Sequence, residues 1–119
     1  MNRGASRKPF PISISQSQLN AATVLTLSGR LDGLASPILD QKVDALVASG
    51  VRSVVFDCSG LAYVSSAGLR SFLTAAKKLK TASGKASFAA LAPAVHGVFE
   101  LSGFLTVLEV HPTVASAAA

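Results

Sequence analysis

Strand-like and helix-like segments alternate along the chain from residue 22 to residue 110. The clearest strand pattern covers residues 53–57, a mainly apolar run of the kind found in strands buried on both faces of a sheet. Before and after it, apolar residues recur at helical spacing. Strands and helices in this order favour a central parallel sheet joined by right-handed crossovers. The sequence therefore predicts an α/β fold.

The start of the chain is expected to add a hairpin to this sheet. Residues 12–15 alternate apolar and polar side chains and residues 22–27 form a β-branched run, so they should pair through a turn within residues 16–21. Two further strands are expected at residues 86–91 and 106–110. Three helices are expected: one from an N-cap at Ser36 to Gly50, one from Ser65 or Ser66 to before Gly84, and one from Pro93 to Ser102. After Pro112 the chain should form a helical turn or two or a frayed end. The prediction is one domain with a mixed, mainly parallel sheet of about five strands and helices mostly on one face.

Much of the positive charge of the chain lies outside the expected domain. The chain has 119 residues, enough for one compact domain, which we expect at residues 10–119 after a flexible basic leader at residues 1–9. The net charge is +5, but three of the eleven basic residues fall in the first eight positions, leaving eight basic against six acidic residues. The mixed aromatic and basic pattern of RNA-binding sheets is missing, so direct nucleic-acid binding is not expected.

The residue content argues against several kinds of site. One cysteine, Cys58, and two well separated histidines, His96 and His111, do not suit a disulfide framework or a Cys/His zinc site, and no cofactor is implied. The chain has neither a G-x-S-x-G nucleophile elbow nor a phosphate-binding P-loop. No apolar run is long enough to span a bilayer, and polar residues stand where a signal peptide would be apolar. We expect a metal-free, cytoplasmic protein without a membrane span.

One segment concentrates residues suited to a binding site. Residues 57–70 leave the central strand, pass through a loop and enter the second long helix, at the strand end where functional groups gather in open α/β sheets. Ser65 and Ser66 stand at the helix start, followed by the small residues Ala67 and Gly68. Only one serine can cap the helix, so the other hydroxyl is expected to be accessible to a partner's active site. The alternatives are that the serines only stabilise the helix, or that one is the nucleophile of a small hydrolase.

Three blocks of the sequence resemble the STAS domains, a family named for sulphate transporters and anti-sigma factor antagonists. The blocks are residues 29–32, residues 57–69 and residues 93–104. The middle block is the most specific, because it combines a strand-ending aspartate, an aromatic residue and a helix entrance of two hydroxyl residues at the family's spacing. The resemblance implies that residues 10–119 form a STAS domain.

The resemblance also implies which residues form the site. Alignment on Gly68 places the phospho-acceptor at Ser66, with Ser65 as second choice because it stands where the family usually has an aspartate. Asp32 resembles an acidic residue that the family places beside this serine. Arg70 lies one helical turn after Ser66 and either pairs with the phosphate or with an acidic patch of the partner, or is only a solvated helix residue. The partner-binding surface is expected to comprise Asp32, Gly33, Ser65, Ser66, Ala67, Gly68 and Arg70, with no catalytic or metal-binding residue.

The function that the resemblance implies is partner switching in transcription control. An unphosphorylated antagonist of this family binds an anti-sigma factor that is itself a serine kinase and displaces the sigma factor. Phosphorylation by the kinase then releases the antagonist, and a serine phosphatase reverses the modification. ATP and Mg²⁺ would belong to the kinase, so this chain would be a substrate and ligand and not an enzyme. The alternative is a STAS subunit that is not phosphorylated, either a signalling scaffold or an accessory subunit of a membrane transport complex.

Overall fold

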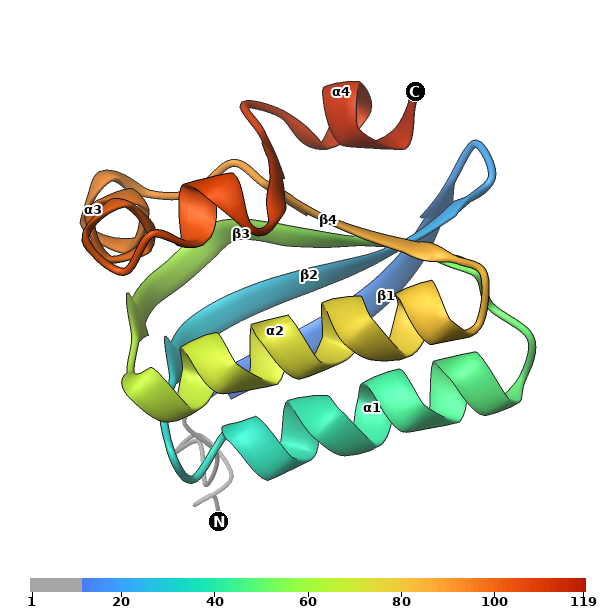
Figure 1. Ribbon diagram of the computed structural model, residues 1–119, viewed down its shortest axis with the longest axis horizontal. Helices are drawn as coiled ribbons and strands as arrows, with labels where there is room; N and C mark the ends of the chain where they lie inside the picture. Colours follow the sequence, from blue (N-terminus) through green and yellow to red (C-terminus); the bar gives the residue numbers. More distant parts are fainter. Residues whose placement is uncertain (1–11) are drawn as a thin grey trace, which may run out of the picture.

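The computed structural model describes residues 12–119, which form a five-stranded mixed sheet with helices on both faces (Figure 1). The elements in chain order are β1 (Ile12–Leu19), β2 (Ala22–Leu31), α1 (Ser36–Ala48), β3 (Ser53–Val64), α2 (Ser66–Thr81), β4 (Lys85–Ala89), α3 (Pro93–Leu101), the 3-10 helix η1 (Phe104–Thr106), β5 (Glu109–His111) and α4 (Val114–Ala118). The strands lie in the order β1-β2-β3-β4-β5, with β1 antiparallel to β2 and every later pair parallel. The predicted α/β fold with a mainly parallel sheet is confirmed. The leader expected at residues 1–9 lies outside the described residues.

Three of the four α-helices share one core, as expected. α1 and α2 lie side by side across one face of the sheet (Figure 1), and α3 adds Val95 and Phe99 to the same buried cluster. α4 lies on the opposite face, where Ala117 and Ala118 pack in a second cluster with Val24 of β2. The expectation of helices mostly on one face is confirmed, with this short C-terminal helix as the exception.

Four phenylalanines form the centre of the main core. Phe56 of β3 and Phe88 of β4 are register partners, and their rings stack with centroids 4.8 Å apart. Phe72 of α2 lies 4.8 Å from Phe88, and Phe99 of α3 lies 6.0 Å from Phe72. All four side chains are fully buried. Because aromatic pairs add to the burial of apolar area, this cluster holds the two central strands against α2 and α3.

The connection into α2 is a bulged strand, and the prediction of a loop there was wrong. β3 continues past Asp57 to Val64 and stays beside β2 over its whole length. The pairing shifts register at two places, because β3 fits more residues than β2 along the same edge. Ser59 and Gly60 are exposed in this stretch, so the apolar pattern that marks a buried strand is interrupted there.

The start of α1 also differs from the prediction, because Ser36 is not the N-cap. The N-cap is Ala35, and Ser36 is the first helical residue. Asp32 supplies the side-chain acceptor: its Oδ1 accepts hydrogen bonds from the backbone N–H groups of Leu34 and Ala35, both at 3.1 Å. The Ser36 hydroxyl donates to the Asp32 carbonyl oxygen at 2.8 Å. The carboxylate of Asp32 therefore orders the loop that leads into α1.

The strands at the C-terminal edge are shorter than predicted. β4 ends before Ala90, which adopts a left-handed conformation (φ 58°) and donates its N–H to the His111 carbonyl oxygen at 3.2 Å. After α3, Gly103 (φ 76°) leads into η1 instead of a strand, and Phe104 packs against Phe99 with centroids 6.2 Å apart. β5 therefore begins only after η1, and the tail forms α4, the helical one of the two expected alternatives.

Glu109 of β5 is the centre of a polar cluster at this edge of the sheet. Its Oε2 accepts hydrogen bonds from His111 Nε2 at 2.7 Å and from the Ser87 hydroxyl at 3.0 Å, and Lys85 Nζ lies 3.5 Å away. The hydrogen bond from His111 is the main reason that the pKa of Glu109 lies below its ordinary value of 4.5; Ser87 and Lys85 lower the pKa further, against the effect of desolvation.

We predict that Glu109→Gln removes a pH-dependent part of the stability. The pKa of the carboxyl is lower in the folded chain, so its stabilising effect is complete above about pH 4.5 and is lost as the pH falls through the folded pKa. The side chain is 44% exposed, which limits the effect to about 1 kcal/mol or less. Urea unfolding at about pH 6 and about pH 3 should show the difference between the two proteins shrinking in acid. A difference that is the same at both pH values would contradict the prediction.

Candidate functional site

The two serines at the start of α2 have different roles. Ser65 is the N-cap, and its hydroxyl oxygen accepts a hydrogen bond from the backbone N–H of Gly68 at 3.3 Å. Ser66 is the first helical residue and is exposed. Within residues 12–119 the Ser66 hydroxyl has no hydrogen-bond partner. The geometry therefore leaves one hydroxyl accessible, while the neighbouring hydroxyl stabilises the helix.

The start of α2 lies tightly against the end of β2. The backbone N–H of Ser65 donates to the Leu31 carbonyl oxygen at 2.9 Å. Gly68, one turn into the helix, is buried, and a Cβ added there would lie only 2.5 Å from the same oxygen. Only glycine allows this close approach of α2 to β2. Gly68 therefore helps to fix the position of the first turn of α2, and because it is buried it is not part of the accessible surface of the site.

The loop between β2 and α1 forms the second part of the site. Asp32 is half-buried, and its Oδ2 lies 3.8 Å from Arg30 Nε, while Oδ1 is held by the loop backbone. Gly33 is exposed beside it. Because Leu31 and Val64 are register partners at the ends of β2 and β3, this loop and the start of α2 lie next to each other. The structure thus places Asp32 and Gly33 close to Ser65.

The residues predicted for the site gather at one end of the molecule, where α1 and α2 begin (Figure 1). Gly33, Ser66 and Arg70 are exposed, and Asp32, Ser65 and Ala67 are half-buried. Arg70 has no ion-pair partner within residues 12–119. The first turn of α2 contains no acidic side chain, so the partial positive charge of the helix start is not neutralised there. The dipole at the start of α2 therefore favours an added negative charge there, while the carboxylate of Asp32 in the adjacent loop is paired with Arg30 and the loop backbone.

Three exposed or partly exposed residues, Leu34, Tyr63 and Arg30, were not predicted from the sequence to belong to this surface. Leu34 follows Asp32 and Gly33 in the loop and is 77% exposed, which is unusual for leucine. Tyr63 is 41% exposed, and the guanidinium carbon of Arg30 lies 4.2 Å from the centre of its ring. The signal for Leu34 was available, since it is an apolar residue outside every strand and helix pattern. The Arg30–Tyr63 contact depends on the bulged register of β3 and had no local signal.

Cys58, in the middle of β3, is fully buried. Burial is the main reason that its pKa is raised to about 12, and the carboxylate of Asp57 raises it further. The thiol therefore stays protonated at neutral pH and is not a nucleophile. Residues 12–119 contain no group of three or more His, Cys, Asp or Glu side chains arranged to hold a metal ion. In the same residues, no helix combines the length and the apolar character needed to cross a membrane.

A match to a protein-family model identifies the family of this chain. The model of the STAS domain matches residues 13–117, almost all of the described chain. The chain belongs to the STAS domain family. The resemblance in the three sequence blocks is thereby confirmed, and so is the fold that it implied.

Three similar proteins match this chain over most of its length. BtrV of Bordetella bronchiseptica, a candidate anti-sigma factor antagonist, is 34% identical over 108 residues, which are 91% of this chain and 93% of BtrV. An anti-sigma factor antagonist from Mycobacterium paratuberculosis has a crystal structure with a TM-score of 0.81 at 26% identity, covering 92% of this chain and 93% of that one. A candidate antagonist from Thermotoga maritima shares the fold, with a TM-score of 0.82 at 14% identity over 87% and 90% of the two chains.

Proposed function

We propose that this STAS domain is an anti-sigma factor antagonist. The Mycobacterium paratuberculosis anti-sigma factor antagonist and BtrV, a candidate antagonist, support this, because both are similar over more than nine-tenths of the chain. The direct partner is then an anti-sigma factor, and the biological effect is the release of a sigma factor for transcription in the cytoplasm. The protein acts by binding and needs no catalytic residue of its own.

We further propose that Ser66 is the phosphorylation site that controls this binding. The observation that carries the proposal is the division of roles at the start of α2: Ser65 is engaged as the N-cap, and Ser66 presents a free, exposed hydroxyl. A kinase needs access to the hydroxyl oxygen and a backbone that stays folded while it is modified. Ser66 meets both conditions, whereas phosphorylation of Ser65 would remove the cap of α2.

The charge of a phosphate explains how Ser66 acts as a switch. Phosphorylation adds about −1.5 to −2 charges. At the start of a helix this charge is favourable by about 0.3 to 1 kcal/mol, so the domain stays folded. In the contact with the anti-sigma factor the same charge is desolvated, and without a cationic partner it costs several kcal/mol. The modification therefore weakens the complex without unfolding the antagonist.

The surface around Ser66 has the features of a protein-binding site. Leu34 supplies an exposed apolar side chain, and Tyr63 and Arg30 supply an aromatic ring and a guanidinium group held against each other. Exposed aromatic, arginine and large apolar residues contribute most of the affinity in many interfaces. We propose that the anti-sigma factor covers Leu34, Ser66 and Arg70 together, so that the phosphate falls inside the interface.

Phosphorylation of purified protein tests the proposal. The natural protein, Ser66→Ala and Ser65→Ala are each incubated with ATP, Mg²⁺ and an anti-sigma factor serine kinase, and phosphate is located by mass spectrometry. One phosphate on Ser66 is expected in the natural chain and in Ser65→Ala, none in Ser66→Ala, and a metal-dependent serine phosphatase should remove it. Modification of Ser65 alone would refute the assignment to Ser66. No modification, with a kinase that is active on another substrate, would favour the scaffold or transport-accessory function.

A further inference from the structure

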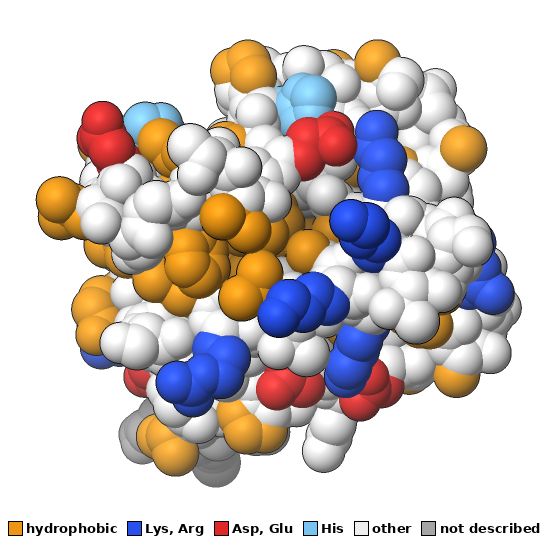
Figure 2. Space-filling model, viewed as in Figure 1, with side chains coloured by type: hydrophobic (Ala, Val, Ile, Leu, Met, Phe, Trp, Pro, Cys, Tyr) orange, Lys and Arg blue, Asp and Glu red, His pale blue; other side chains and the backbone are white. Residues whose placement is uncertain are grey.

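A second charged surface lies along the later turns of α2, away from Ser66. Figure 2 shows hydrophobic side chains gathered beside α2, with a row of basic side chains along their border. All four charged residues of α2 are basic: Arg70, Lys77, Lys78 and Lys80. Lys77 follows Ser66 by eleven residues, which corresponds to about 16 Å along the helix axis. A partner bound here would leave Ser66 accessible.

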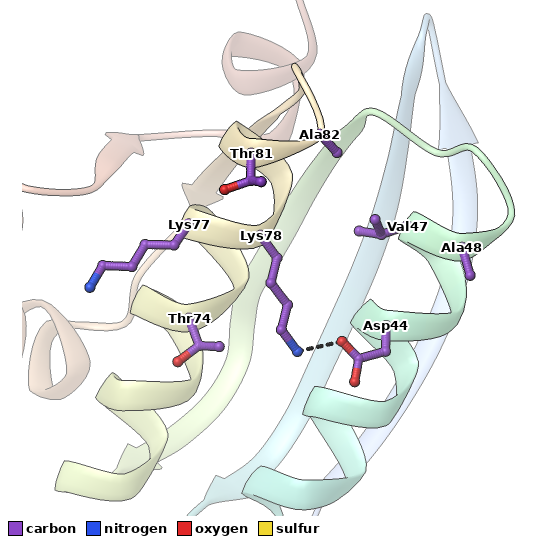
Figure 3. A pocket seen from close by; sticks show the side chains of 8 residues that line it. All are labelled: Asp44, Val47, Ala48, Thr74, Lys77, Lys78, Thr81 and Ala82. Carbon is purple, nitrogen blue, oxygen red and sulfur yellow. Dashed lines mark hydrogen bonds and ion pairs between the residues drawn. The ribbon is translucent and has the colours of Figure 1, made fainter.

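The lysines of α2 differ in whether their charge is already paired. Lys78 reaches across to α1 and forms an ion pair with Asp44, which lines the groove between the two helices (Figure 3). Lys77 points away from Asp44 in the same view. Lys77 and Lys80 are exposed and have no ion-pair partner within residues 12–119. Because they are three residues apart, they lie on the same side of the helix.

An apolar groove lies directly beside Lys80, and Lys77 is one turn away on the same side of α2. It has a volume of about 320 Å³ between α2 and the η1–β5 segment, and Ala76, Lys80, Lys85 and Val107 are among the residues that line it. Val107 is 62% exposed, so a β-branched apolar side chain is in contact with water. Glu109 also lines the groove, but it is bound by His111, Ser87 and Lys85 within the domain. Lys85 and Glu109 therefore pair with each other, and among residues 12–119 Lys80 is left as the unpaired charge in the lining of the groove.

Lysines at the end of a helix are explained in part by the helix dipole. The dipole does not explain why Lys80 lines an apolar groove that contains an exposed valine, with Lys77 one turn away on the same side of α2. We propose that this groove, with Ala76, Val107, Lys80 and Lys85 in its lining and Lys77 nearby on the same side of α2, docks an acidic amphipathic helix of a second protein partner. The apolar face of that helix covers the groove, and carboxylates spaced three or four residues apart pair with Lys77 and Lys80.

The groove favours a protein helix over a lipid surface as its occupant. Its apolar residues line a concave surface, whereas insertion into a membrane needs apolar side chains that project beyond the charged ones. Lys77 and Lys80 both belong to α2 and lie on the same side of that helix, an arrangement that matches the acidic edge of an amphipathic helix. The proposal does not depend on Ser66, because neither the groove nor its lysines contact the start of α2.

A titration with a defined probe tests the docking surface. The probe is a capped helical peptide of about 18 residues, about 27 Å long, made of alanine, leucine and glutamate with the leucines on one face. The comparison peptide has lysine in place of each glutamate. Amide shifts of the ¹⁵N-labelled full chain are expected at Lys77, Lys80, Lys85 and Val107 with the acidic peptide only, and they should weaken when the salt is raised from about 0.1 M to about 1 M.

Variants make the test specific. Lys77→Glu/Lys80→Glu is expected to weaken binding of the acidic peptide about tenfold or more, while Lys42→Glu, a charge reversal on α1, changes the affinity less than about twofold. Phosphorylation of Ser66 and binding of the anti-sigma factor should be unchanged in the double variant. Equal binding of the basic peptide, shifts centred elsewhere, loss of anti-sigma factor binding in the double variant, or binding only to vesicles of phosphatidylcholine and phosphatidylglycerol would overturn the proposal.

Discussion

Ser66→Glu is expected to weaken binding of the anti-sigma factor by about tenfold to a hundredfold, while Ser66→Ala binds normally. A hundredfold loss corresponds to about 2.7 kcal/mol, which is within the cost of placing an unpaired carboxylate in a desolvated contact. Glutamate carries one charge where phosphate carries nearly two, so its effect is a lower limit on that of phosphorylation. The free domain should be as stable as the natural one or slightly more, because a carboxylate at the first helical position suits the helix dipole.

The measurement needs binding and stability from the same preparations. Affinity for the anti-sigma factor is measured by calorimetry, and the thermal midpoint of each free protein is recorded. Ser17→Glu places the same charge on the exposed edge strand β1 and serves as the matched control, with unchanged affinity expected. If Ser66→Glu binds as tightly as the natural protein, the control of binding by charge at this position is refuted. If it binds weakly but is also unfolded, the loss has a structural cause.

The order of the elements and the type of sheet could be predicted because local signals agreed with one another. Alternating strand and helix patterns allow few arrangements, and right-handed crossovers reduce them to a parallel sheet. The strands at the C-terminal edge were harder to place. The left-handed residues Ala90 and Gly103 end or redirect the chain there, and residues 106–108, predicted as the start of a strand, lie at the end of η1 or between η1 and β5.

The site was only partly predictable for a related reason. The two serines were informative because only one can cap α2, which is a local rule. The family resemblance placed the phospho-acceptor at Ser66, with Ser65 as second choice, whereas the hydrogen bond from Gly68 N–H to Ser65 was needed to show which serine caps the helix. The position of Asp32 beside them depends on the pairing of β2 with the bulged part of β3, a contact between segments about thirty residues apart that no local pattern encodes. A β-bulge changes the direction of side chains, but the residues that form it have no characteristic composition in the sequence. The contact between Arg30 and Tyr63 was therefore also missed.

Gly68→Ala is expected to destabilise the domain and weaken partner binding, although alanine is the better helix former. In an open helix the change would be stabilising by up to about 1 kcal/mol. Here the new Cβ would lie 2.5 Å from the Leu31 carbonyl oxygen, 2.9 Å from Leu31 Cγ and 3.0 Å from Val64 Cγ1. Overpacking of this kind costs about 1–3 kcal/mol, so the clash outweighs the helix propensity.

The clash also acts on the site, because the same carbonyl oxygen anchors it. The Leu31 oxygen accepts the hydrogen bond from Ser65 N–H, so moving the first turn of α2 away to make room for a methyl group would lengthen that bond and displace Ser66. Gly97→Ala in α3 is the matched control, since a Cβ there meets nothing within 4 Å. It should raise the free energy of unfolding by up to about 1 kcal/mol and leave binding unchanged. Urea unfolding and calorimetry of both variants measure the two effects, and a Gly68→Ala protein that is as stable as Gly97→Ala would show that α2 is not held against β2 as described.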